Sequence, residues 1–349
     1  MIRRTRTSAP TDAAHEPIVT IEMVARAAGV SPSTVSRILN GTAAVNRAKV
    51  DAVEQAIASL GYVPNPVARG LAGGRTLSVG VVTQSLDSPF YGAALGGIEM
   101  ELQAIGYTPL FISGQWNELE EQRSLAVLRA RRVDGIIALD ARLSDDALVA
   151  LARELPVVVT GRKLEAPNLA SLHFDNFGGA VQATEYLLEL GHRRIAFITG
   201  APDHQDSLER QRGYLQALSA HGLAADPQLI VAGDYREVSG QKAIERLLRE
   251  GIAFTAVFAA NDQMALGAVL GLYQHHVAVP QRVSVVGFDD LQAGQFSTPP
   301  LTSVHQPSQE MGQLAARAMA ALLAGQRPQL RMPPPHLIVR ESAGPCREA

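Results

Sequence analysis

One short run of polar side chains offers the chemistry of nucleic-acid binding. Ser31 stands where it could cap a helix, and Pro32 would take the first position of that helix. Ser33, Ser36 and Arg37 then fall on the outer side of the helix. An arginine can donate two parallel hydrogen bonds to a guanine, and serine hydroxyls reach phosphates or bases. The segment therefore predicts recognition of a base sequence from the major groove of DNA.

No comparable set of residues predicts catalysis. The sequence contains no GxGxxG after its first expected strand, no GxxxxGK[ST] and no GxSxG. The pairs His275-His276 and Asp289-Asp290 are adjacent, so neither presents two ligands on one helical face. The single cysteine, Cys346, excludes an intramolecular disulfide and favours a reducing compartment. We therefore predict that the protein is not an enzyme, with no catalytic residue, no metal site and no cofactor.

The composition indicates a globular protein with more than one part. The chain has 349 residues, 46% apolar and 19% charged, enough for a small module plus one bilobal or two ordinary domains. No run of about 18 apolar residues is present, so we predict no membrane span. Residues 1–17 carry arginines but no apolar core, which predicts a flexible leader, not a secretion signal, and a cytoplasmic protein.

The charge of the chain is unevenly distributed. Residues 1–75 hold nine lysines and arginines against five acids, a net charge of +4. The whole chain carries −3, so the remainder carries −7. A basic head on an acidic body suits a polyanionic partner for the head, although ordinary scatter of charges would give a similar imbalance.

Three helices are expected to position the polar run. Thr20, Ser31 and Asn46 can each cap a helix, and a glycine follows the expected end of each one. The first two helices would meet through a tight turn, as in a helix-turn-helix. A three-helix bundle that only packs remains an alternative. Beyond it, Pro64 and Pro66 bound a glycine-ended connector that is too short to be more than marginally helical alone.

The remainder of the chain alternates between short β-branched runs and helical stretches. This alternation predicts parallel sheets covered by helices on both faces, in two similar lobes, with a ligand at the carboxyl ends of the strands. The expected strands lie at 77–82, 133–139, 156–160, 193–200, 229–235, 255–262 and 282–290.

The N-terminal run TIEMVARAAGVSPSTVSRILNG resembles the LacI/GalR repressor family, whose signature is V-x-x-x-A-G-V-S-x-x-T-V-S-R. The similarity continues through G-Y-x-P-N-x-x-A-R-x-L and covers roughly residues 18–343. The matching positions of the first run are Val24, Ala28, Gly29, Val30, Ser31, Thr34, Val35, Ser36, Arg37, Leu39, Asn40 and Gly41.

The resemblance implies an N-terminal all-α helix-turn-helix headpiece followed by an α/β two-lobed effector domain similar to periplasmic binding proteins. The implied divisions are a leader at 1–17, the headpiece at 18–63, a hinge helix or linker at 64–75 and the effector and dimerisation domain at 76–349. The N-lobe would comprise about 76–173 plus 305–332, and the C-lobe about 174–304 plus 333–349.

The family resemblance also implies how the headpiece binds DNA. The hinge, 65–73, would become helical only on DNA, and Leu71 would wedge open a base step in the minor groove. A plain linker is the alternative. The predicted DNA-binding residues are Thr20, Ser31, Pro32, Ser33, Thr34, Ser36, Arg37, Asn40, Asn46, Tyr62, Asn65, Ala68, Arg69 and Leu71.

For the effector, the resemblance implies contacts by Arg210, Asn261 and Asp289 in the C-lobe. A carboxylate facing an arginine can clasp vicinal hydroxyls while an aromatic ring covers the apolar face of a sugar. Further implied contacts are Phe90, Tyr91, Tyr235, Phe296 and Gln306.

Purely structural roles for these residues stay open at this point. Arg210 could make a surface ion pair, Asp289 could cap a helix, and Asn261 could only cap the helix that follows it. Arg162 leaves the charge of the effector open: an inward side chain favours an acidic or phosphorylated sugar, and an outward one a neutral sugar.

The sequence as a whole predicts a homodimeric, sequence-specific transcriptional regulator. It would bind a pseudopalindromic operator and be released or recruited by a small carbohydrate-type effector, in the cytoplasm and on the nucleoid when DNA-bound. A repressor is favoured, with activation left open. No leucine heptads follow 337–343, so a dimer is expected, and association of dimers is left open. The alternative is a cytoplasmic sugar sensor whose N-terminal helices contact another protein.

Overall fold

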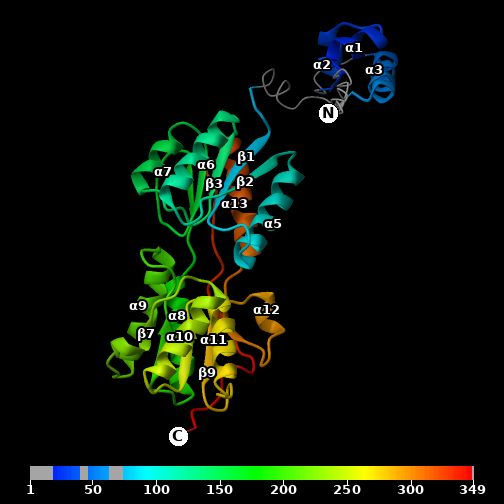
Figure 1. The fold of residues 1–349 in the computed structure, drawn as a ribbon. Coiled ribbons are helices and arrows are strands. Elements are labelled where there is room, and N and C mark those ends of the chain that lie inside the picture. Colours follow the sequence, from blue (N-terminus) through cyan, green and yellow to red (C-terminus); the bar gives the residue numbers. More distant parts are fainter. Residues whose placement is uncertain (1–18, 40–45, 63–73, 348–349) are drawn as a thin grey trace, which may run out of the picture. The chain divides into compact units, whose positions relative to one another are not determined.

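The computed structural model describes residues 19–39, 46–62 and 74–347. The chain divides into two compact units, Met1–Thr76 and Leu77–Ala349, which we call the headpiece and the body (Figure 1). No helix in the described ranges is both long and apolar enough to cross a membrane.

The described part of the headpiece consists of three short helices around one small core. They are α1 (Ile21–Ala27), α2 (Pro32–Leu39) and α3 (Arg47–Leu60). Val24, Val35 and Val53, one from each helix, are fully buried against one another. The predicted turn between α1 and α2 is present, and Gly29 in it has φ +65°, a conformation that glycine adopts without strain.

Two of the three predicted helix caps form as expected. The Thr34 N–H donates to the Ser31 hydroxyl at 3.3 Å, and the Ala48 N–H donates to Asn46 Oδ1 at 3.1 Å. Thr20 occupies the N-cap position of α1, but its hydroxyl makes no capping hydrogen bond. The position was thus predicted correctly and the bond was not.

Within residues 74–347, which are described without a gap, two sheets form the two lobes of the body. The N-lobe contains a five-stranded, all-parallel sheet. In sheet order its strands are β2 (Thr108–Ser113), β1 (Ser78–Thr83), β3 (Gly135–Ala138), β4 (Val157–Thr160) and β5 (Leu169–Leu172). The helices of this lobe are α5 (Pro89–Ala104), α6 (Glu118–Ala130), α7 (Asp145–Ala152) and α13 (Ser308–Leu323).

The C-lobe contains a six-stranded sheet that is parallel except for β11 at one edge. In sheet order its strands are β11 (His336–Ile338), β10 (Thr302–His305), β9 (Ser284–Asp289), β8 (Ala256–Ala259), β6 (Ile195–Ile198) and β7 (Ile230–Val231). Its helices are α8 (Asn176–Glu189), α9 (Gln205–Ala220), α10 (Glu237–Arg249), α11 (Asp262–Gln274) and the short α12 (Gln292–Gln295).

The chain passes between the lobes three times within residues 74–347. It leaves the N-lobe after β5, returns after β10 to form α13, and enters the C-lobe again at β11. Figure 1 shows α13 beside the sheet of the N-lobe, with α5 on the same face, although the two helices lie far apart in the sequence. Their close approach requires Gly97, where a Cβ atom would stand 2.2 Å from the Gln309 carbonyl oxygen.

Each of the seven expected strand segments contains a strand, because uninterrupted β-branched runs predict strands buried on both faces. The sequence reading missed β2, β5, β10 and β11. β2 contains Pro109 and is only half-buried, so its pattern resembles a loop. β11 is a short antiparallel edge strand, which the expectation of wholly parallel sheets did not include.

Candidate functional site

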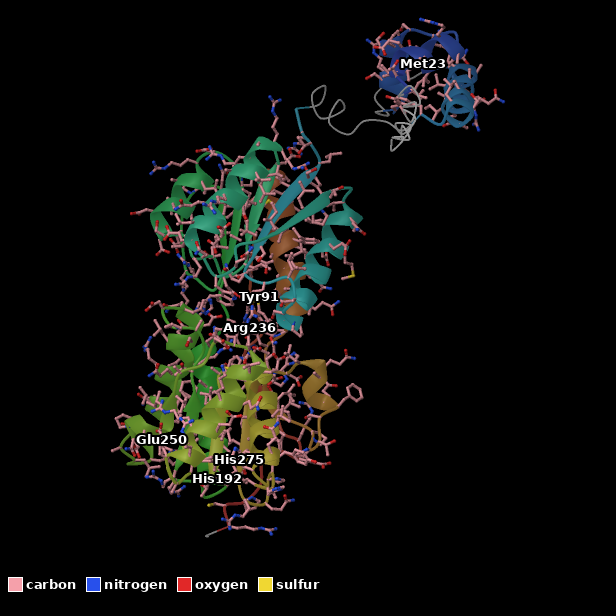
Figure 2. All side chains as sticks on the ribbon, viewed as in Figure 1. Met23, Tyr91, His192, Arg236, Glu250 and His275 are labelled. Atoms are coloured by element: carbon pink, nitrogen blue, oxygen red, sulfur yellow. The ribbon has the colours of Figure 1, made fainter. Side chains whose placement is uncertain are left out.

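A cleft of about 130 Å³ lies between the two lobes. Its walls are the loops that follow the carboxyl ends of β1, β2 and β3 in the N-lobe and of β6, β7, β8 and β9 in the C-lobe, together with the first turns of α9. Figure 2 shows Tyr91 and Arg236 where the lobes meet, whereas Glu250, His192 and His275 lie toward the far end of the C-lobe. The prediction of a ligand site at the carboxyl ends of the strands therefore fits this cleft.

Arg210, on α9, forms the floor of the cleft and is 4% exposed. Its Nε donates to Asn176 Oδ1 at 2.9 Å, its Nη2 donates to Gln306 Oε1 at 2.8 Å, and its Nη1 donates to the Ala260 carbonyl oxygen. The guanidinium also lies 3.7 Å from the centre of the Phe288 ring. These contacts hold the cation rigidly, and they show that Arg210 does not form the surface ion pair that the sequence left open.

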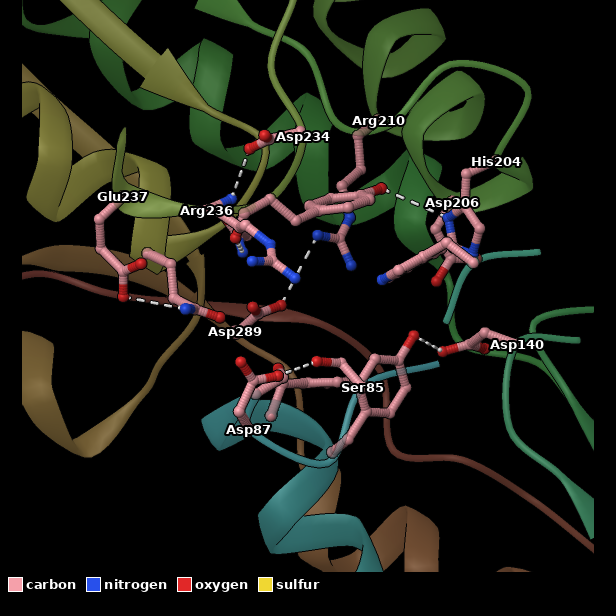
Figure 3. A pocket seen from close by; sticks show the side chains of 17 residues that line it. Ser85, Asp87, Asp140, His204, Asp206, Arg210, Asp234, Arg236, Glu237 and Asp289 are labelled. Carbon is pink, nitrogen blue, oxygen red and sulfur yellow. Dashed lines mark hydrogen bonds and ion pairs between the residues drawn. The ribbon is translucent and has the colours of Figure 1, made fainter. Parts of the chain in front are cut away.

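Asp289 faces Arg210 across the floor, as the sequence predicted. Asp289 Oδ1 lies 3.6 Å from Arg210 Nη1, and Figure 3 shows the pair pointing toward one another inside the cleft. Burial raises the pKa of Asp289 to about 7, against the opposing attraction of Arg210. The distance leaves room for a ligand hydroxyl to bond both groups.

Asn261 lines the cleft and also caps α11. Its Oδ1 accepts the Met264 N–H at 3.0 Å, and its Nδ2 donates to the Tyr235 carbonyl oxygen at 3.0 Å. The capping interpretation that the sequence left open is therefore correct in geometry. The second bond also fixes the backbone that carries Tyr235, so Asn261 orders the aromatic wall beside it.

Aromatic side chains from both lobes meet inside the cleft. Trp116, the one tryptophan of the sequence, follows β2 and stacks on Tyr235 at 5.7 Å with an interplanar angle of 23°. His204 lies edge-on to both rings, and Tyr91 lies edge-on to Trp116. Gly200 makes this possible, because a Cβ atom there would stand 2.1 Å from the Tyr235 ring. Such flat faces are suited to covering the apolar side of a sugar ring.

Two buried carboxylates from opposite lobes converge beside Gly161. Asp140 accepts the Tyr91 hydroxyl at 3.0 Å and the Thr160 hydroxyl at 2.8 Å. Asp206 Oδ1 is buried with no hydrogen-bond partner. A Cβ atom at Gly161 would stand 2.7 Å from Asp140 Oδ1 and 3.6 Å from Asp206 Oδ1. Burial and the Asp140 carboxylate together raise the pKa of Asp206 to about 7.

A buried polar network behind the N-lobe wall positions Trp116 and Asp140. Glu121 is fully buried on α6 and accepts hydrogen bonds from the backbone N–H groups of Arg142 and Leu143 and from Gln84 Nε2. Gln84 Nε2 also donates to the Asp140 carbonyl oxygen, and Gln84 Oε1 accepts the backbone N–H of Trp116 at 3.1 Å. The Glu121 carboxylate thus orders the loops that follow β1, β2 and β3, partly through Gln84.

Sequence reasoning missed Gln84, Glu121, Trp116, Asp140 and Asp206. An acidic residue in a helical stretch is usually exposed, so nothing in the local pattern distinguishes Glu121 from its neighbours. Trp116 carried a usable signal, because a lone tryptophan after a strand is a common ligand contact, but β2 itself was not recognised.

The remaining predicted effector residues divide into three groups. Phe90, Tyr91 and Tyr235 line the cleft. Gln306 lies behind Arg210 and holds its guanidinium. Phe296 is 79% exposed at the end of α12 and is not part of the cleft wall.

Arg162 lies outside the aromatic cleft but lines a neighbouring space between the lobes, together with Asp140 and Asp206. Its guanidinium pairs with Asp145 at 2.7 Å and donates to the Ala141 carbonyl oxygen, and it does not line the cleft.

The exposed side of α2 presents several of the side chains that the sequence assigned to DNA. Pro32, Ser33 and Arg37 are exposed. Ser31 Oγ lies 2.8 Å from Ser33 Oγ and 2.9 Å from Thr34 Oγ1, so these hydroxyls share hydrogen bonds at the positive end of the helix dipole. Such an end is suited to binding a phosphate.

The other predicted DNA-binding residues have mixed positions. Thr20 and Asn46 are exposed, Ser36 is half-buried, and Tyr62 is half-buried against the core of the headpiece. Asn40, Asn65, Ala68, Arg69 and Leu71 lie outside the described residues, so the hinge helix and the Leu71 wedge stay predictions.

We expect Glu121→Gln to destabilise the body by about 2–3 kcal/mol, because an amide group would replace an acceptor that backbone N–H donors surround. The matched control is Glu120→Gln, whose side chain forms an exposed ion pair with Arg123 and should cost less than about 1 kcal/mol. Urea unfolding followed by Trp116 emission measures both. Equal losses in the two variants would contradict the positioning role of Glu121.

We expect the Asp206→Asn variant to gain stability relative to the parent protein as the pH rises from about 5 to about 8. The folded-state pKa of Asp206, about 7, lies above the ordinary value of 3.8, so the parent protein loses stability as the pH rises between these two values. Asparagine has no proton to lose, so the difference between the two melting temperatures should grow with pH. A difference that stays constant would contradict the buried, unpartnered state of Asp206.

Comparison with known proteins covers both units of the chain. Residues 20–65 match the model of the lacI family of bacterial regulatory proteins, and residues 184–343 match a periplasmic binding protein-like domain. These are the two parts that the residues alone had suggested.

Individual relatives match over nearly the whole length. The chain is 39% identical to the HTH-type transcriptional regulator CelR of Thermobifida fusca over 334 residues, which cover 93% of this chain and 98% of CelR. Among solved structures, a CelR–cellobiose complex is 37% identical with a TM-score of 0.69, and the alignment covers 93% of this chain and 100% of that one. A lac repressor dimer bound to operator and the anti-inducer ONPF is 30% identical with a TM-score of 0.84, over 93% of this chain and 99% of that one. The chain belongs to the lacI family of bacterial transcriptional regulators.

Proposed function

We propose that this regulator binds operator DNA through the outer side of α2 and that a neutral carbohydrate in the interlobe cleft controls this binding. The observation that carries the proposal is the pairing of an exposed recognition helix with a cleft floored by Arg210 and Asp289. Dimers would place two α2 helices in successive major grooves of a pseudopalindrome, about one helical turn apart.

The lining of the cleft favours a neutral effector. An anionic sugar would meet a surplus of negative charge there, since only two arginines oppose six acids, and one of the two, Arg210, already has its partners. Neutral hydroxyls, by contrast, can donate to carboxylates and accept from a guanidinium. The acids that line the cleft are Asp87, Asp140, Asp206, Asp234, Glu237 and Asp289.

Cellobiose is the first effector to test. The CelR structure in the comparison is a complex with this neutral disaccharide, and the two chains are 37% identical. The aromatic side chains that line the cleft, among them Phe90, Trp116 and Tyr235, offer apolar surface against which the axial hydrogens of a glucose ring can pack. The sugar releases the protein from DNA if sugar and operator prefer different arrangements of the lobes. It recruits the protein to DNA if both prefer the same arrangement.

The remaining parts of the proposal follow from this one. We propose that the chain comprises a leader (1–17), a helix-turn-helix domain (18–63), a hinge (64–75) and an effector domain (76–349). We also propose that the protein acts in the cytoplasm and is associated with the nucleoid when it is bound to DNA. We also propose that the cleft binds its sugar without catalysis, because the relatives that match nearly the whole chain are named as regulators.

We expect Arg37→Lys to reduce the preference for the operator by about 1–3 kcal/mol, because lysine keeps the charge but loses the bidentate contact to a base. The operator would come from selection by the parent protein in a randomised duplex library. Binding to the selected and a scrambled duplex is then measured over a range of salt concentrations. The salt slope should stay unchanged because the charge is retained.

The control for this experiment is Arg246→Lys on α10, which should leave both quantities unchanged. Undiminished preference for the operator in Arg37→Lys would contradict base reading by this residue.

We expect Asp289→Asn to weaken cellobiose binding at least about tenfold, because the charge-assisted hydrogen bonds to the sugar hydroxyls are lost. Trp116 lies in the cleft, so its emission reports each titration directly. Asp146→Asn, an exposed aspartate in the first turn of α7, is the matched control and should bind cellobiose like the parent protein. Equal cellobiose affinities of the parent protein, Asp289→Asn and Asp146→Asn would contradict a contact between Asp289 and the sugar.

A further inference from the structure

Two histidines lie side by side at the edge of the C-lobe sheet, and neither lines the cleft. In the antiparallel pairing of β10 with β11, His305 lies directly opposite His336. Residues opposite each other in such a pair project from the same face of the sheet, with Cβ atoms about 4.5–5.5 Å apart. The two ring centres are 4.9 Å apart, and the rings are tilted by 45°. The two imidazoles are therefore close enough for one small ion to bind both.

Asp290 orients the ring of His305. Its Oδ2 lies 2.9 Å from His305 Nδ1, and its Oδ1 accepts a hydrogen bond from Arg340 Nη2 at 2.6 Å. Because a carboxylate accepts a proton at this position, a neutral His305 ring carries its proton on Nδ1 and keeps a lone pair on Nε2. Histidines that bind metals usually donate their other ring N–H to a carboxylate in this way, which fixes the ring and makes the nitrogen a stronger ligand.

The pair is accessible from solvent and differs from the other histidines. The His305 side chain is 35% exposed, and His336 is exposed. Within the described ranges, theirs is the one ring contact between two histidines. His192, by contrast, has hydrogen bonds at both ring nitrogens, and His173 is paired with Glu209. An ion can thus reach the His305–His336 pair without breaking a buried network.

The charges around the pair oppose one another. Asp290 attracts a cation, whereas Arg340 repels one, although its guanidinium is directed at Asp290 and at the Leu301 carbonyl oxygen. The described residues contain no group of three or more histidine, cysteine or acidic side chains arranged to hold a metal. Two imidazoles would therefore supply the protein ligands, and water would complete the coordination shell.

We propose that His305 and His336 form a binding site for a divalent transition-metal ion of the kind that imidazole prefers, with Asp290 as a positioning residue. The chain leaves the C-lobe for α13 just after β10 and returns at β11. A bound ion would hold these two crossing segments together. Spacing along the sequence gives no sign of this site, because antiparallel pairing brings distant residues together. The site shares no residue with the lining of the cleft, so it does not depend on a carbohydrate effector.

The test is a calorimetric titration of Zn²⁺ into the full chain, purified without a polyhistidine tag and freed of metal with a chelator. X-ray absorption at the zinc edge should show imidazole nitrogens at about 2.0–2.1 Å. We expect His336→Gln and His305→Gln each to weaken Zn²⁺ binding at least about tenfold, because each variant loses one of two ligands. Asp290→Asn keeps both ligands and should weaken binding about 10- to 100-fold, the usual effect of removing the carboxylate behind a metal-bound histidine.

His275→Gln is the matched control, because His275 is an exposed histidine that follows α11 on the same lobe. It should bind Zn²⁺ like the parent protein. Thermal unfolding without metal checks that every variant is folded. Excess Zn²⁺ should raise the melting temperature of the parent protein and of His275→Gln, and it should leave those of His305→Gln and His336→Gln nearly unchanged.

Two results would overturn the site. One is a parent protein that does not bind Zn²⁺. The other is an unchanged Zn²⁺ affinity in both His305→Gln and His336→Gln, which would locate the ion elsewhere on the chain. An affinity that falls in these two variants but not in Asp290→Asn would contradict the positioning role of Asp290.

Discussion

The buried guanidinium of Arg210 is the constraint on which the body of this protein depends. A charge removed from water must be paired or fully hydrogen-bonded, or the fold loses several kcal/mol. Arg210 meets this requirement with partners from four separate segments: Asn176 at the start of α8, the Ala260 carbonyl after β8, Asp289 at the end of β9 and Gln306 after β10. The same bonds that satisfy the cation therefore assemble the floor of the cleft.

The cleft above this floor is lined by more acidic than basic side chains, and this excess bears on how a sugar could act as an effector. Asp140 comes from the N-lobe and Asp206 from the C-lobe, and both carboxylates lie beside Gly161. Burial and the Asp140 charge raise the pKa of Asp206, so a proton or a hydroxyl donor at this position is favoured. A sugar that bridges these groups would stabilise one arrangement of the lobes over another. Such a difference in affinity is what an effector must have to shift a conformational equilibrium.

The sequence predicted those features that local chemistry determines. Capping residues and glycines located α1 to α3, and β-branched runs located the central strands, because both signals act within a few neighbouring residues. The pairing of Arg210 with Asp289 also followed, once the family resemblance had placed both residues at strand ends.

What could not be predicted depends on contacts between distant segments. Glu121 is a buried acceptor only because two loops fold over it, and Asp206 is unpartnered only because Gly161 leaves space beside it. Phe296 shows the opposite error, since it was predicted to contact the effector yet lies exposed outside the cleft wall. Residue type alone carried none of this information.

The central claim is that sugar in the cleft and operator on α2 are energetically linked. The most direct measurement is a cellobiose titration of Trp116 emission, performed once on the free protein and once with saturating operator DNA. The account predicts dissociation constants that differ by roughly fivefold or more, a coupling of about 1–3 kcal/mol, with an equal factor for operator affinity with and without sugar. Identical dissociation constants with and without DNA would contradict it.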